Sequence, residues 1–366
     1  MSEQPTPLEA DIRRRIAAAG AMPVSEYMAL CLTHPQHGYY TSANPLGAAG
    51  DFITAPEVSQ MFGELVGLWM ATVWQQLGAP EHVRIVDLGP GRGTLINDAL
   101  RAAAIVPGFR AAVVLHLVEI NPLLEAQQQH TLEPLAIACY WHPSLAEVPN
   151  GPAIIVANEF FDALPVNQAV KTADGWHERQ VGIDADGKLA FTLAPAPMAH
   201  FERLLPETVR QAPLDSIFEW RDETSAMELG RRVARDAGAA LVIDYGHGES
   251  AAGDTLQAVG RHAYADPLAA PGTLDLTAHV DFQSLARAAE AMGAKAYGPI
   301  EQSVFLRRLG IESRANTLKA NASHIEAMQI DAALERLTGS GRGSMGTLFK
   351  ALALVPPALA APTAFA

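Results

Sequence analysis

Three glycines at alternate positions follow an apolar run, 83–88, whose single acid is Asp87. The glycines are Gly89, Gly91 and Gly93, and a helical pattern begins near Thr94. This order predicts a buried strand, a tight turn and a helix N-terminus, the unit that receives nucleotide-like ligands. Glycine is needed because the backbone must adopt positive φ and approach the ligand closely. The helix N-terminus adds N–H donors that suit a carboxylate or a phosphate.

Two acids and a threonine select among nucleotide-like ligands. Asp87 would repel a pyrophosphate, but it would attract the amino or sulfonium group of S-adenosylmethionine. Glu119 ends the next apolar run, 113–118, where a carboxylate can accept hydrogen bonds from both ribose hydroxyls. Thr94 stands where the dinucleotide fingerprint requires its last glycine. These residues favour S-adenosylmethionine over NAD and make an NAD-dependent oxidoreductase the weakest alternative.

A second polar cluster follows the apolar run 153–157 directly, and it contains Asn158, Glu159 and Asp162. Helical stretches alternate with apolar runs here, which predicts a parallel sheet that binds its ligands at the carboxyl ends of the strands. Glu159 is therefore predicted to be functional, whereas for Asp162 a turn or capping role is an equal alternative. Farther along, His279 is a candidate to line the same site.

Other patterns predict the remaining elements. Thr54 and Glu57 have the spacing of a capping box before a helical period that runs to Leu77. Gly63 and Gly67 on the flank of that helix indicate close packing against a neighbour. Segment 166–205 has hairpin turn signals and interrupts the α/β alternation. A late cluster, 345–350, is expected to form a closing strand.

Composition limits the class of protein. The chain has 366 residues, 49% hydrophobic and 18% charged, with a net charge of −14, which argues against non-specific nucleic-acid binding. Its two cysteines, Cys31 and Cys139, have no CxxC spacing, so neither a disulfide framework nor a structural zinc site is expected. No signal-peptide pattern opens the chain, and prolines interrupt the apolar tail. We therefore expect cytoplasmic residence, no membrane span and no bound metal.

Six blocks in order carry a family resemblance over nearly the whole chain. They are 38–40 (GYY), 50–57 (GDFITAPE), 87–94 (DLGPGRGT), 158–165 (NEFFDALP), 244–247 (DYGH) and 275–282 (DLTAHVDF). In these blocks the chain resembles the MidA-like family of S-adenosylmethionine-dependent methyltransferases, whose mitochondrial members assist complex I assembly. Residues 217–223 depart from the family pattern, which leaves Glu219 without a predicted role.

The resemblance implies an α/β fold of the class I (Rossmann-like) methyltransferase type. Its seven-stranded, mostly parallel sheet would be formed by 81–165 and 225–366. Residues 1–80 would form an N-terminal helical segment that packs on this core and closes the cofactor site. Residues 166–224 would form an inserted antiparallel subdomain on the substrate side.

The resemblance also implies roles for individual residues. Glycines of the loop would hold the methionine end of the cofactor, Glu119 would hold its ribose, and the block that starts at Gly50 would close over it. The predicted cofactor-binding residues are Gly50, Asp51, Phe52, Asp87, Gly89, Pro90, Gly91, Gly93, Thr94, Glu119 and Asn158. The predicted catalytic residues are Glu159, Asp162 and His279.

The mitochondrial relatives are understood to methylate an arginine of a complex I subunit. The resemblance thus implies a protein substrate carrying an arginine, such as a respiratory-chain subunit, with the oligomeric state left open. Two alternatives from other classes stay open at this point. One is a non-catalytic assembly scaffold that keeps the cofactor fold, and the other is a small-molecule methyltransferase.

Overall fold

The computed structural model describes residues 5–42, 54–260 and 263–366. The chain divides into two compact units. The unit that we call the sheet unit contains Ile53–Phe161, Glu223–Gly248 and Phe282–Ala366. The other, the hairpin unit, contains Met1–Phe52, Asp162–Asp222 and Glu249–Asp281. Among the described residues, no helix has both the length and the apolar composition needed to cross a membrane.

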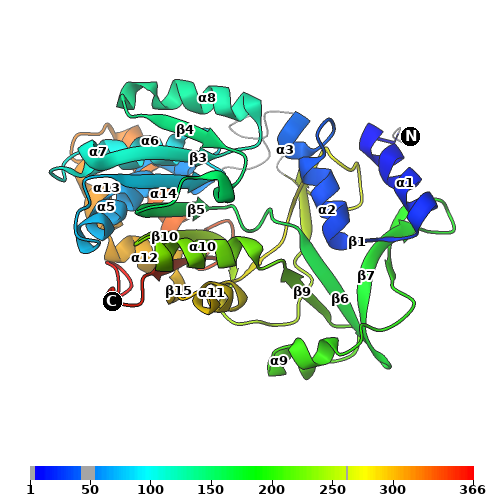
Figure 1. Ribbon diagram of the computed structural model, residues 1–366. Helices are drawn as coiled ribbons and strands as arrows, with labels where there is room; N and C mark the ends of the chain where they lie inside the picture. The colour runs from blue at the N-terminus through cyan, green and yellow to red at the C-terminus, as the bar shows by residue number, and fades with distance from the viewer. Residues whose placement is uncertain (1–4, 43–53, 261–262) are drawn as a thin grey trace. The chain divides into compact units, whose positions relative to one another are not determined.

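A mixed sheet forms the centre of the sheet unit, with its strands in the order β15-β16-β10-β5-β2-β3-β4 (Figure 1). These strands are β2 (Val83–Leu88), β3 (Val113–Val118), β4 (Cys139–His142), β5 (Ala153–Asn158), β10 (Ala239–His247), β15 (Lys295–Glu301) and β16 (Phe349–Val355). Neighbours from β4 to β10 pair in parallel, and β16 pairs antiparallel with both β10 and β15. The predicted mostly parallel central sheet is confirmed, although in the described part of the chain the sheet has eight strands and not the seven expected.

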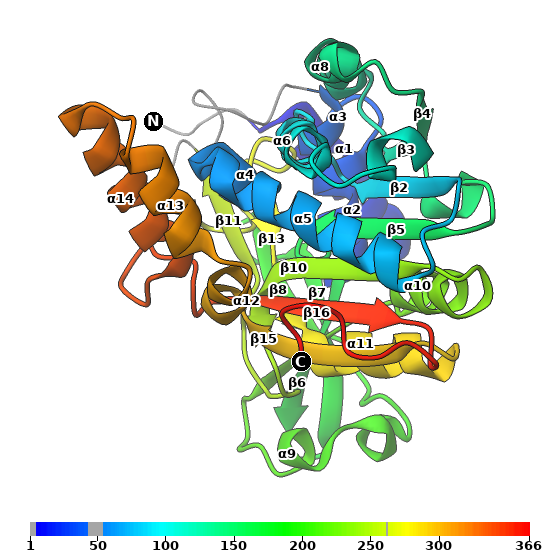
Figure 2. The same cartoon turned by 90° about the vertical axis from the view of Figure 1, so that its left-hand side faces the viewer.

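Helices cover the two faces of this sheet. Because strand residues alternate between faces, Ile85, Leu115 and Ile154 share one core with the helices α5 and α6. Figure 2 shows α5 running across that face. On the other face, α10 and α11 pack on β10 and β16. The helices are α4 (Ala55–Val58), α5 (Gln60–Gln76), α6 (Thr94–Ala103), α7 (Phe109–Ala112), α8 (Pro122–Leu132), α10 (Thr224–Arg235), α11 (Phe282–Ala291), α12 (Gln302–Arg308), α13 (Ile311–Lys319) and α14 (His324–Thr338).

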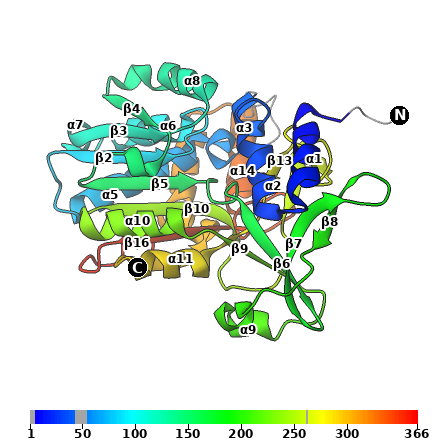
Figure 3. The ribbon, with the colours of Figure 1, turned by 45° about the vertical axis from the view of Figure 1, so that its right-hand side comes forward.

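The hairpin unit contains an antiparallel sheet in the order β1-β7-β6-β9, with β8 beside β7. Strands β6, β7, β8 and β9 of this sheet are labelled in Figure 3. A second, small sheet has the order β12-β11-β13. The strands are β1 (Met22–Pro23), β6 (Val166–Thr172), β7 (Gly175–Ile183), β8 (Leu189–Leu193), β9 (Ile217–Arg221), β11 (Gln257–Gly260), β12 (Ala263–Ala265), β13 (Asp275–Thr277) and β14 (Val280–Asp281). The helices are α1 (Pro7–Ala19), α2 (Val24–Thr33), α3 (Tyr39–Ser42) and α9 (Glu207–Arg210). Residues of α1, α2, β6, β7, β11 and β13 share one apolar core.

The boundaries of the two units differ from the expected division into 1–80, 81–165 with 225–366, and 166–224. The first 80 residues split, since α1 and α2 bury their apolar faces in the hairpin unit while α5 buries Phe62 and Trp69 in the sheet unit. Segment 249–281 joins the hairpin unit because Ala258 and Leu276 are buried in its core. The insertion therefore folds together with two segments that lie far from it in sequence.

Two local predictions were wrong. Thr54 makes no side-chain capping bond, and the helix expected to follow it is interrupted at Ser59, whose hydroxyl caps α5 instead. The closing strand is Phe349–Val355, not 345–350, because the apolar run after Lys350 is the part buried between β10 and β15.

The close packing predicted from Gly63 and Gly67 is confirmed at the contact of α5 with α6. A Cβ built on Gly67 would lie 2.1 Å from the Ala99 carbonyl oxygen, and one on Gly63 would lie 2.8 Å from Asp98 Cβ. These distances leave no room for a methyl group, so the two glycines set the separation of the helices.

We expect Gly67→Ala to lower the free energy of unfolding by about 1–3 kcal/mol, because the backbone of α6 must move, and this outweighs the usual helical advantage of alanine. Gly341→Ala is the matched control, since the nearest atom to its Cβ would be Ser344 Oγ at 3.8 Å. Urea unfolding followed by circular dichroism measures both variants. Equal stability of the two would contradict the packing described here.

Candidate active site

The glycine-rich loop joins the carboxyl end of β2 to the N-terminus of α6. Gly89, Gly91 and Gly93 all have positive φ, at 65°, 57° and 82°. This left-handed conformation is strained for residues with a Cβ, so the glycines are required by the path of the backbone. Gly93 is the N-cap of α6, and helix N–H groups therefore point toward the loop.

Asp87 lies directly below this loop and is almost fully buried, with 2% of its surface exposed. Burial raises the pKa of its carboxyl well above the ordinary value, and the negative charge of Glu119 raises it further. Among the described residues, no group forms a hydrogen bond with its Oδ2 atom. A buried acid of this kind fits a cationic ligand group, because such a group would supply the missing partner.

Glu119 follows β3, and its carboxylate is fixed from two sides. Its Oε1 accepts hydrogen bonds from the backbone N–H groups of Ile120 and Asn121, both at 2.8 Å. Its Oε2 accepts one from Gln128 Nε2 at 3.0 Å. Burial raises the pKa of Glu119, and these hydrogen bonds oppose the increase.

Gln128 organises this part of the site, although the sequence analysis did not identify it. The residue is fully buried. Its Nε2 also donates to the Gly91 carbonyl at 2.8 Å, and its Oε1 accepts from Trp141 Nε1 at 2.8 Å. One amide therefore joins the loop, the Glu119 carboxylate and β4. One feature of the sequence could have identified Gln128 as functional. It is a polar residue on α8 between the buried Leu124 and Leu132, at a position where an apolar residue is expected.

Helix α4 is connected to the loop through Glu57. Glu57 Oε1 accepts a hydrogen bond from Thr94 Oγ1 at 2.7 Å, and Oε2 accepts one from Arg92 Nη1 at 3.3 Å. Glu57 thus holds the loop and the first residue of α6. It does not form the capping box that its spacing to Thr54 predicted.

Glu159 follows the last residue of β5 in a left-handed conformation, with φ of 50°. Such a backbone costs free energy in a residue with a Cβ and is concentrated at functional sites. Its Oε1 accepts hydrogen bonds from the Ala55 N–H at 3.0 Å and from Asn158 Nδ2 at 3.3 Å. The same α4 turn therefore contacts both Glu159 and, through Glu57, the glycine-rich loop.

The turn after Glu159 is fixed by the fully buried Asp244 of β10. Asp244 Oδ2 accepts a hydrogen bond from the Phe161 N–H at 2.9 Å. Phe160, which lies between Glu159 and Phe161 in the chain, is beside the glycine-rich loop, because a Cβ built on Gly89 would be 3.2 Å from Phe160 Cδ2. The sheet unit thus brings the ends of β2 and β5 together beside Asp244 of β10.

Asp162 and His279, the other predicted catalytic residues, belong to the hairpin unit. Arg221 holds the backbone of both, donating to the Asp162 carbonyl at 3.2 Å and to the His279 carbonyl at 2.7 Å. Two more carbonyls, those of Leu164 and Ala278, accept from the same guanidinium at 3.1 and 2.6 Å. Arg221 is a positioning residue for this pair of segments.

Glu219, left without a role in the sequence analysis, also positions His279. Its carboxylate accepts hydrogen bonds from the Thr255 hydroxyl and from the Thr255 N–H, the latter at 3.1 Å. The Thr255 hydroxyl in turn accepts from the His279 N–H at 2.9 Å. Nothing in the local sequence indicated this chain of bonds, because its members lie on three separate segments.

The predicted cofactor-binding residues of the sheet unit thus lie at one edge of the sheet. They are Asp87, Gly89, Pro90, Gly91, Gly93, Thr94, Glu119 and Asn158. Gly50, Asp51 and Phe52 lie outside the described residues.

The residues at this edge fit S-adenosylmethionine by their chemistry. The helix N-terminus suits its carboxylate, the buried Asp87 suits its cationic end, and Glu119 suits a ribose diol. The Asn158 Oδ1 atom, buried and without a hydrogen-bond partner among the described residues, adds one further acceptor. A mostly parallel sheet with this loop and these acids defines the class I methyltransferases.

Comparison with known proteins agrees with the geometry. A family model for S-adenosyl-L-methionine-dependent methyltransferases matches residues 65–300. The chain is 37% identical to the protein arginine methyltransferase NDUFAF7 homolog, mitochondrial, of Drosophila melanogaster, over 97% of this chain and 86% of that one. It is 37% identical to the human mitochondrial protein arginine methyltransferase NDUFAF7, over 96% of this chain and 84% of that one.

A solved structure resembles the whole chain. It is that of a protein from Burkholderia thailandensis bound to S-adenosyl-homocysteine, with 31% identity and a TM-score of 0.84, covering 100% of this chain and 97% of that one. The chain belongs to the family of S-adenosyl-L-methionine-dependent methyltransferases, which confirms the predicted family and cofactor. It is an enzyme of that class, and the alternative of a non-catalytic scaffold is set aside.

We expect Gly91→Val to abolish binding of S-adenosylhomocysteine, because a branched Cβ occupies the side of the loop that must approach the ligand. Gly310→Val is the matched control, since Gly310 also has positive φ, at 90°, but a Cβ there would meet no atom within 4 Å. Isothermal titration calorimetry compares the two variants. Normal affinity in Gly91→Val would refute the placement of the loop.

A second prediction concerns the bond between Glu57 and Thr94. Glu57→Ala and Thr94→Val should each weaken S-adenosylhomocysteine binding about tenfold, the usual order for a hydrogen bond to a charged group. The double variant should be no weaker than the worse single variant, because both remove the same bond. If the two losses of affinity multiplied in the double variant, the two residues would act independently and the prediction would be wrong. Glu81→Ala, at an exposed position, serves as the control.

Proposed function

We propose that this enzyme transfers a methyl group to an arginine side chain of a partner protein. The observation that carries the proposal is the Glu159 carboxylate, held by the Ala55 N–H and the Asn158 amide at the end of β5. Strand β5 pairs directly with β2, so this carboxylate and the cofactor loop follow adjacent strands. The names of the relatives, which describe protein arginine methyltransferases, support the same acceptor.

The chemistry of guanidinium methylation explains the need for a carboxylate. S-adenosylmethionine, when bound, supplies an electrophilic methyl group on its sulfonium. The guanidinium is a planar cation, so a carboxylate can bind it through two parallel hydrogen bonds and fix its plane. Glu159 would thereby orient a nitrogen lone pair toward the methyl group and exclude water from the contact.

The attacking nitrogen must also lose a proton. His279 is our candidate proton acceptor and Asp162 our candidate second carboxylate, and Arg221 fixes the backbone of both within the hairpin unit. Tyr40 lies near Asp162 and donates a hydrogen bond from its hydroxyl to Asp275 Oδ1 at 2.9 Å. Burial, together with the charges of Asp275 and Asp162, raises the pKa of Tyr40 well above its ordinary value, so its hydroxyl stays protonated.

The family resemblance makes an arginine of a respiratory-chain subunit the first acceptor to test. Cytoplasmic residence stays a prediction from composition. A small-molecule acceptor is the alternative function, because class I folds accept many substrates.

We expect Glu159→Gln to keep its affinity for S-adenosylhomocysteine within about threefold but to lose at least about a hundredfold in methyl transfer, since an amide cannot pair with a guanidinium through two acceptors. Transfer of labelled methyl to proteins in an extract from a deletion strain measures turnover. Mass spectrometry of the hydrolysed protein identifies the methylated residue. Glu133→Gln, at an exposed position, is the control.

The results test the role of Glu159 and the identity of the methyl acceptor separately. Undiminished turnover in Glu159→Gln would remove this residue from the mechanism. Label found only in small molecules, or in protein residues other than arginine, would replace the proposed acceptor while leaving the methyltransferase assignment intact.

A further inference from the structure

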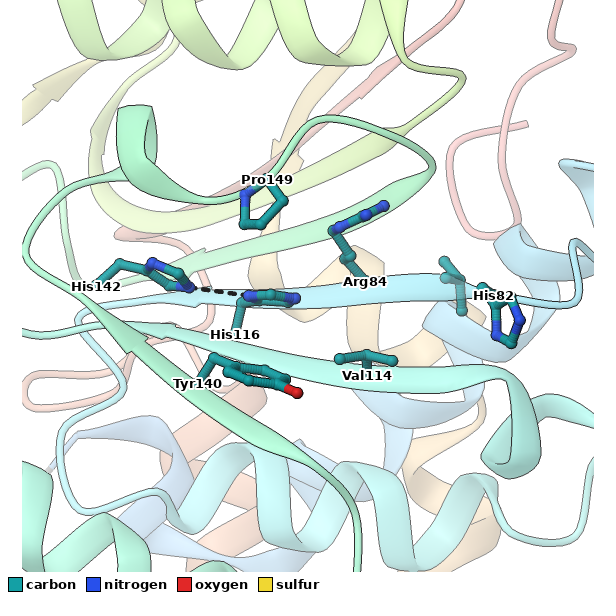
Figure 4. A pocket seen from close by; sticks show the side chains of 8 residues that line it. His82, Arg84, Val114, His116, Tyr140, His142 and Pro149 are labelled. Carbon is teal, nitrogen blue, oxygen red and sulfur yellow. Dashed lines mark hydrogen bonds between the residues drawn. The ribbon is translucent and has the colours of Figure 1, made fainter.

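A cavity of about 490 Å³ opens on the face of the sheet that carries α10 and α11, above β2, β3 and β4 (Figure 4). It is lined by His82, Val83, Arg84, Val114, His116, Tyr140, His142 and Pro149. The glycine-rich loop follows the carboxyl end of β2, whereas Val83 and Arg84 begin that strand. The cavity is therefore a feature separate from the cofactor loop.

Strand register builds this cavity. Arg84 pairs with Val114, and His116 pairs with Tyr140, so in parallel strands these side chains stand on one face. The loop before β5 forms the opposite wall, and the buried Arg232 of α10 holds it by donating to the Val148 carbonyl at 2.7 Å. Both walls are thus fixed by paired backbone or by a buried side chain.

The Arg84 guanidinium is the first polar group in the cavity. It lies over Gly151, whose Cβ, if present, would be 2.4 Å from Arg84 Nη1. Among the described residues, no carboxylate forms an ion pair with it. A partly buried guanidinium without a carboxylate partner favours an anion.

The second polar group is a pair of histidines. His116 Nδ1 and His142 Nε2 share one hydrogen at 2.9 Å, drawn as the dashed line in Figure 4. His116 is only 4% exposed. When His142 donates, the His116 Nε2 atom on the other side of the ring carries a hydrogen and becomes a donor. In the described part of the chain, no group of three or more His, Cys, Asp or Glu side chains is arranged to hold a metal ion.

The rest of the lining is apolar or aromatic. Tyr140 stacks on His116 with ring centroids 5.3 Å apart, and His116 stacks on His142 at 5.1 Å. Tyr140 is 53% exposed, so its ring is accessible from the cavity side and from solvent. Val83, Val114 and Pro149 complete these walls. Apolar walls with a few convergent polar groups, in a volume of this size, are typical of small-molecule sites.

We propose that this cavity binds a small organic carboxylate, with its carboxylate on the Arg84 guanidinium and His116 Nε2–H and its apolar or aromatic body against Tyr140 and Val114. A carboxylate matches these donors, because one guanidinium and one ring N–H can donate hydrogen bonds to its two oxygens. A phosphate has more oxygens and would require more donors than the cavity supplies. The site is independent of the acceptor proposed above.

Binding should strengthen as pH falls. In the free protein, burial and the charges of His142, Arg84 and Arg232 lower the pKa of His116 to about 4. Burial and Arg232 also lower the pKa of His142, against the opposing charge of Glu147. An anion beside His116 stabilises its protonated form and raises that pKa, so the complex takes up a proton that the free protein does not hold.

Isothermal titration calorimetry with benzoate and 1-naphthoate tests the site, with benzamide and 1-naphthamide as neutral controls of the same shape. We expect both acids to bind at least about tenfold more tightly than their amides, and Arg84→Met to remove that difference. Arg235→Met, an exposed arginine of α10, should bind like the wild type. Tyr140→Ala should weaken both 1-naphthoate and 1-naphthamide, and thermal melting checks that each variant folds.

Several results would overturn the proposal. One is the absence of binding by either acid up to about 20 mM, where a real small-molecule site would be detected. Others are unchanged binding in folded Arg84→Met, or displacement of the acid by S-adenosylhomocysteine, which would move it to the cofactor site. Sedimentation showing a dimer that Arg84→Met dissociates would instead assign the cavity to a subunit interface.

Discussion

The parallel pairing of β2, β3 and β5 is the constraint on which the rest of the active site depends. Asp87, Glu119 and Asn158 are far apart in sequence, yet each lies within one residue of the end of its own strand, and parallel pairing brings those ends to one edge. A buried parallel strand has no room for unpaired polar groups along its length. Polar side chains are therefore concentrated where the strands end. The loops at these ends can position those side chains only if the loop backbone is fixed.

Fixing those loops requires buried residues whose hydrogen bonds go to the protein itself. Gln128 holds the Gly91 carbonyl and Glu119 together, and Asp244 holds the turn that follows Glu159. Each satisfies polar groups that the edge of the sheet leaves unpaired, so its own burial carries little net cost. The precision of the site comes from this supporting layer as much as from the glycines.

The sequence predicted the parts that depend on local pattern. The strand 83–88, the loop glycines and the acids Asp87 and Glu119 were predicted because period and residue type are local signals. Boundaries that depend on tertiary burial were not predictable in this way, as the shift of the last strand to Phe349–Val355 shows. Arg221 and Glu219 were also missed, since their partners come from segments that only the fold brings together. The Thr54 capping box failed because Glu57 finds a stronger tertiary partner in Thr94.

Helix α4 connects the Glu159 carboxylate to the N-terminus of α6 through two hydrogen bonds. Its Ala55 N–H binds the Glu159 carboxylate, and two residues later Glu57 binds the first residue of α6. A ligand that displaced the Glu159 carboxylate from α4 would therefore change the free energy of the glycine-rich loop, and a cofactor bound to the loop would change the affinity of that ligand by the same factor. One turn of helix would thus act as a reciprocal coupling element between the two sites.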